Sequence, residues 1–133
     1  KSRKSADATN MDELVKAVQV YAVDNAIVKK TNEIKVTIQL TKDGVKGADT
    51  ANGGTTTPGN LKATDIATEA FEAYVPNWKN IKLKSEQWGG NPTVELTIDA
   101  EGGVKTTNVA PPDFKKFYGG ADTTVAPAEG TNP

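Results

Sequence analysis

The stretch SADATNMDELVKAVQVYAVDNAI, residues 5–27, carries the clearest helical pattern in the chain. Successive residues on an α-helix lie about 100° apart, so apolar residues three and four positions apart share one face. Six residues of this stretch fall within one stripe about 120° wide: Met11, Leu14, Val15, Val18, Tyr21 and Ala22. A stripe of this width predicts a long helix, and these six residues are its predicted sheet-packing face.

A second apolar group on the same helix lies on the opposite side, at Val20, Val23 and Ile27. A helix with a single buried face does not need these residues, so they are a candidate subunit contact. The alternative is that the end of the helix sinks into its own domain. The helical pattern begins almost at once, with no methionine, signal peptide or obvious N-cap before it. We therefore expect that a preceding helical segment is missing from this sequence.

Composition narrows the class of function. The chain has 133 residues, which is the size of one domain, and its net charge of −1 argues against a nucleic-acid partner. It contains no cysteine and no histidine, so it lacks the commonest general base, the commonest metal ligand and any disulfide. We expect a protein that is not an enzyme and that holds no cofactor or metal. The sequence has no apolar run of about 18 residues that could span a membrane.

Alternation of apolar and polar residues predicts the strands. Residues 33–41, EIKVTIQLT, alternate strictly, which is typical of a half-buried strand. Further strands are predicted over residues 80–88, 93–99 and 104–108, with Gly-rich turns between them. The first strand has four residues on its apolar face: Ile34, Val36, Ile38 and Leu40.

The remaining segments complete the predicted architecture. A short helix over residues 64–75 has Thr64 as its N-cap and stops before Pro76. Residues 44–60 have no periodicity and predict a long connection. Phe114, Phe117 and Tyr118 are expected to fasten a last segment to the sheet. The prediction is an α+β fold in two layers: a long N-terminal helix on an antiparallel sheet, one accessory helix, a domain over 1–118 and a flexible tail over 119–133.

Candidate binding chemistry is sparse. Asp99 and Glu101 share a Gly-rich turn and could supply oxygen ligands to calcium, but acidic residues are common in such turns. Tyr74, Trp78 and Trp88 could form an aromatic platform for a sugar ring, although aromatic residues of this kind are more often part of a core.

Two segments carry a resemblance to a known family. The helix SADATNMDELVKAVQVYAVDN is similar to the second half of the spine helix of type IV pilins. The hairpin VELTIDAEGGVKTT is similar to the T-D-A-x-G-x-V hairpin of cysteine-free pilins. Over residues 1–108 the chain resembles a type IV pilin, or pilin-like protein, whose soluble headgroup lacks the hydrophobic half-helix. The family's processing site and its apolar segment are absent from the sequence.

The resemblance implies a structural subunit of a cell-surface pilus that serves adhesion, motility or DNA uptake. Such a subunit forms a homo-oligomeric filament through its N-terminal helix, is extracellular, and meets the membrane before assembly only through the missing segment. A host-surface or glycan ligand is a further candidate partner. The absence of cysteine favours a Gram-positive or other cysteine-free branch.

Other functions stay open beside this one. One alternative is a pseudopilin of type II secretion, although Tyr21 is not followed by the Tyr-Pro step usual there. Another is a secreted carbohydrate-binding module that uses Trp78 and Trp88. A third is a surface domain with Lys–Asn isopeptide bonds.

Overall fold

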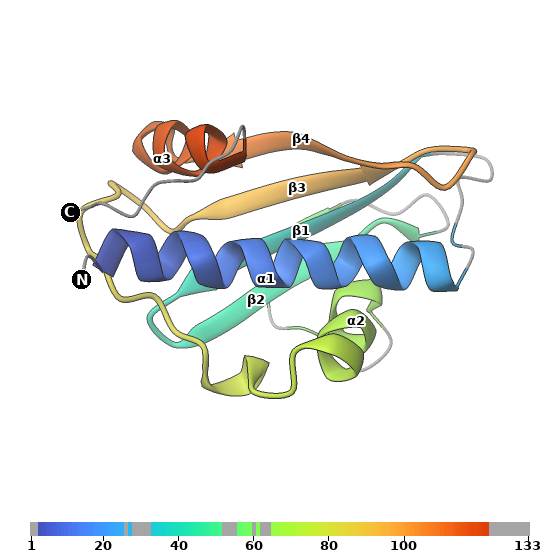
Figure 1. The fold of residues 1–133 in the computed structure, drawn as a ribbon, viewed down its shortest axis with the longest axis horizontal. Helices are drawn as coiled ribbons and strands as arrows, with labels where there is room; N and C mark the ends of the chain where they lie inside the picture. Colours follow the sequence, from blue (N-terminus) through green and yellow to red (C-terminus); the bar gives the residue numbers. More distant parts are fainter. Residues whose placement is uncertain are drawn as a thin grey trace.

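The computed structural model describes residues 3–25, 27, 33–51, 56–59, 61 and 65–122. The fold is α+β, as the sequence predicts: a long N-terminal helix, α1 (Arg3–Asp24), lies along one face of a four-stranded antiparallel sheet (Figure 1). The strands occur in the spatial order β2-β1-β3-β4. Their bounds are β1 (Ile34–Thr41), β2 (Gly44–Asp49), β3 (Thr93–Ile98) and β4 (Val104–Ala110).

Two shorter helices flank α1. α2 (Ile66–Tyr74) lies beside the C-terminal half of α1, and α3 (Pro112–Asp122) lies near its N-terminal half (Figure 1). The hydroxyl of Tyr118 in α3 donates to Asp12 of α1 at 3.5 Å. The sequence predicts only one accessory helix, so α3 is an addition. Phe114 and Tyr118 are both buried and lie four residues apart, which places them on one face of a helix.

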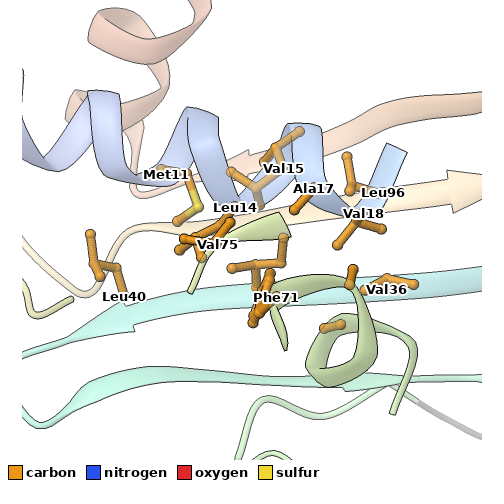
Figure 2. Close-up of a cluster of buried hydrophobic side chains, with 14 of the residues drawn as sticks. Met11, Leu14, Val15, Ala17, Val18, Val36, Leu40, Phe71, Val75 and Leu96 are labelled. Atoms are coloured by element: carbon orange, nitrogen blue, oxygen red, sulfur yellow. The ribbon is translucent and has the colours of Figure 1, made fainter. Parts of the chain in front are cut away.

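The core lies between α1, α2 and the sheet. Figure 2 shows Leu14 and Val18 of α1 pointing toward Phe71 of α2 and toward the apolar face of β1. The four predicted inward residues of β1 are buried, as are three of β3. The labelled members of this cluster are Met11, Leu14, Val15, Ala17, Val18, Val36, Leu40, Phe71, Val75 and Leu96.

One predicted loop contains a strand. Residues 44–49 form β2, which pairs antiparallel with β1 from Thr41↔Gly44 to Val36↔Asp49. Lys42 and Asp43 make the connecting turn, and Gly44 adopts a positive φ of 135° there, which favours glycine. Sequence periodicity misses β2 because an edge strand is held by its backbone hydrogen bonds more than by an apolar face. Residues 52–55 and 60 of the predicted connection lie outside the described residues.

One predicted strand is not a strand. Residues 78–80 form a single 3-10 turn, and the segment after it runs along the molecule without joining the sheet. Ile81 is buried and Leu83 half-buried, which produces the apolar alternation that suggested a strand. Leu83 donates its N–H to Thr41 at 2.9 Å. The next two N–H groups, of Lys84 and Ser85, bind the Asp7 side chain and not a neighbouring strand.

Element ends also differ from the prediction. α1 stops at Asp24 and not at Ile27, and α2 begins at Ile66. Its first N–H is accepted by Asp49 of β2 at 2.8 Å, so a carboxylate from the sheet caps this helix. The predicted cap Thr64 lies outside the described residues. α3 extends to Asp122, past the predicted start of the tail at 119; residues 123–133 lie outside the description.

Gly47 of β2 sits where a side chain does not fit. A Cβ there would lie 2.4 Å from the Thr37 carbonyl oxygen and 3.1 Å from Cδ2 of Leu61. We expect Gly47→Ala to lower the free energy of unfolding by about 2 kcal/mol, because β2 must shift away from β1. Urea unfolding measures this. Gly90→Ala is the matched control, since its nearest atom is 3.8 Å away; equal stability of the two variants would contradict the prediction.

Candidate functional site

The predicted sheet-packing face of α1 is largely buried. Tyr21 is half-buried at the edge of the core. Ala8 and Ala17 extend the buried face beyond the predicted residues. The five remaining residues of the predicted face are each at most 3 % exposed: Met11, Leu14, Val15, Val18 and Ala22. This face packs on α2 as well as on the sheet (Figure 2).

The candidate subunit contact separates into two parts. Val20 is 44 % exposed and Val23 is 67 % exposed, so both side chains face outward from α1. Ile27 lies beyond the helix, half-buried against the core, and its N–H donates to the Ala22 carbonyl at 2.9 Å. Ile27 therefore does not belong to the outward group, because it lies beyond the end of α1 with its side chain packed against the core. Only Val20 and Val23 remain as an exposed apolar pair.

Asp7 is a buried, hydrogen-bonded residue that the sequence pattern did not single out. It is completely buried on the inner face of α1. Its carboxylate accepts from the backbone N–H of Lys84 at 2.8 Å, the N–H of Ser85 at 2.9 Å, and the indole N–H of Trp88 at 3.0 Å. Asp7 lies four residues before Met11, on the same stripe, and that position was a usable signal in the sequence. The contacts make Asp7 a structural clasp between α1 and residues 84–88.

Trp88 is a core residue. It is 2 % exposed, and its ring makes edge contacts with Phe114 at 4.9 Å and Phe117 at 5.6 Å between centroids. Lys4 Nζ lies 4.9 Å from the same ring. The faces of Trp88 are therefore not available to a sugar ring, which corrects its assignment to an aromatic platform. The reason is the Asp7 contact, which holds the indole N–H inward.

Of the other two aromatic candidates, Tyr74 ends α2 and Trp78 lies just after it. Trp78 packs on Phe71 with centroids 5.5 Å apart, and its indole N–H donates to Glu72 at 3.1 Å. Tyr74 is 44 % exposed and its hydroxyl donates to Asp24 at the end of α1. Trp88, by contrast, is bound to the first turns of α1. The structure therefore does not bring Tyr74, Trp78 and Trp88 together.

Two tyrosines tie α1 to α2 in opposite directions. Tyr21 of α1 donates to Glu69 of α2, and Tyr74 of α2 donates to Asp24 of α1. The hydrogen bond to Glu69, then burial and the negative charge of Glu69, raise the pKa of Tyr21 above 10.0. The hydrogen bond to Asp24 likewise raises the pKa of Tyr74. Both shifts arise because each carboxylate is bound by the neutral phenol.

The Asp99 side chain accepts hydrogen bonds within the turn in which it lies. One carboxylate oxygen accepts from the N–H of Glu101 at 2.9 Å and from the N–H of Gly103 at 2.8 Å. This is ordinary turn chemistry for an aspartate. Within the part of the chain that the structure describes, no three acidic, histidine or cysteine side chains gather as a metal site.

We expect Asp7→Ala to lower the free energy of unfolding by about 3 kcal/mol, because it leaves buried N–H donors without an acceptor. Urea unfolding followed by tryptophan fluorescence measures the loss. Trp88→Phe removes only one donor and leaves an aromatic ring, although a smaller one, at this position, so it should cost less. The double variant Asp7→Ala/Trp88→Phe should lose less stability than the sum of the two single-variant losses, because both substitutions remove the same hydrogen bond. Additive losses would contradict the Asp7–Trp88 contact.

The tyrosine contacts predict that the free energy of unfolding falls at alkaline pH. Each tyrosine has a higher pKa in the folded chain than in the unfolded chain, where it is near 10. The two hydrogen bonds therefore stabilise the fold fully below about pH 10, and this stabilisation is lost as the pH rises through the pKa of the folded chain. The difference in unfolding free energy between the wild type and Tyr21→Phe/Tyr74→Phe should therefore shrink at high pH. Urea midpoints between about pH 8 and 12 measure it.

Absorbance at 295 nm supplies the control for this prediction. In Asp24→Asn/Glu69→Gln the same two phenols should ionise at a lower pH than in the wild type, because the carboxylate charges are gone. Native and urea-unfolded wild-type chains that titrate identically would show that the tyrosine pKa values are not raised.

Comparison with known proteins adds no assignment. No family model, no curated protein and no solved structure matches this chain. Among the helices that the structure describes, none is both long enough and apolar enough to cross a membrane. Function therefore has to be argued from the fold and from the surfaces of α1.

Proposed function

We propose that this chain is the globular part of a type IV pilin-like subunit, which assembles into a filament on the bacterial cell surface. The observation that carries the proposal is the double character of α1. One face is buried along the helix from Asp7 to Ala22, while Val20 and Val23 face outward near its end. A helix fixed to its own domain by one face can present its other face to neighbouring copies.

The order of elements supports the proposal. A long first helix laid on an antiparallel sheet is the arrangement implied by the resemblance in the helix and hairpin sequences. The resembling hairpin, VELTIDAEGGVKTT, lies in β3 and β4 and the turn between them. Arg3 begins α1 at one end of the elongated molecule (Figure 1), so a preceding helical segment could continue from there without crossing the sheet.

In this proposal the parts of the molecule have separate tasks. The apolar half-helix, supplied ahead of residue 1, anchors the precursor in the membrane and then packs at the centre of the filament. The sheet and the clasp at Asp7 hold the headgroup to the helix. The proposed product is an extracellular pilus for adhesion, motility or DNA uptake, with no enzymatic step.

Two alternatives fit the molecule to different degrees. A carbohydrate-binding module would have to work without Trp88, whose ring is buried. A pseudopilin of a secretion system would share the architecture, and the contacts among the described residues favour neither it nor a pilus.

The coding sequence upstream of residue 1 tests the proposal most directly. A processing site of the pilin type followed by about 20 apolar residues, enough to span a bilayer, supports it. A conventional signal peptide or a preceding globular domain would overturn it. Labelling of intact cells with an antibody to this chain then distinguishes a filament from a secreted monomer.

Val20→Ser/Val23→Ser should abolish filaments and leave the soluble chain folded, because both side chains are exposed. Sheared filament yield measures assembly, and circular dichroism with urea unfolding measures folding. The free energy of unfolding should change by less than about 0.5 kcal/mol.

Glu13→Ser/Lys16→Ser, also exposed on α1, is the matched control and should leave filaments intact. Normal filaments in the valine variant, or unfolding of its soluble chain, would each contradict the assignment of Val20 and Val23 to a subunit contact.

A further inference from the structure

We draw no further inference here: the strongest candidate, the surface patch of Tyr74 at the end of α2 and Trp78 in the 3-10 turn after it, carries nothing, because Trp78 is already packed on Phe71 and hydrogen-bonded to Glu72, and nothing in the structure shows what covers the exposed part of Tyr74.

Discussion

The contact on which the structure depends is the buried carboxylate of Asp7. A charge taken out of water is strongly unfavourable unless donors replace the lost hydration. Three N–H groups from residues 77 to 81 positions later in the sequence do so here. Because Asp7 is fixed on α1, those donors cannot be placed elsewhere. The contact therefore ties the segment after the 3-10 turn to α1 and holds Trp88 inward.

Polar contacts of this kind lie at both ends of α1, while its middle is held by apolar burial. Toward the C-terminal end, Tyr21 and Tyr74 join α1 and α2 through Glu69 and Asp24. Between the ends, side chains such as Leu14 and Val18 are fully buried. Apolar burial is non-directional and supplies most of the stability, whereas hydrogen bonds have defined partners and fix how the helix is set along the sheet. The same division leaves the outer face of α1 free to contact a neighbouring chain.

The sheet edges bear on how copies could assemble. The outer edge of β2 is partly paired, because Gly47 and Gly59 exchange backbone hydrogen bonds. β4 carries an irregularity opposite Glu95 and Leu96, where Thr107 falls out of register, and bulges of this kind discourage pairing with another strand. Both features disfavour growth by strand addition. They are consistent with the proposal that places contacts between copies on α1.

The sequence alone determined the first helix, its inward stripe, β1, β3, β4 and the α+β class, because periodicities of 3.6 and 2 are local properties of the chain. It also located the exposed pair Val20 and Val23. Only the tertiary structure decided the rest. β2 is defined by its pairing partner, residues 80–88 by the acceptor on α1, and the burial of Trp88 by a carboxylate far away in sequence. These features depend on contacts between residues that are far apart in the sequence, and a local sequence pattern does not show which residues make such contacts.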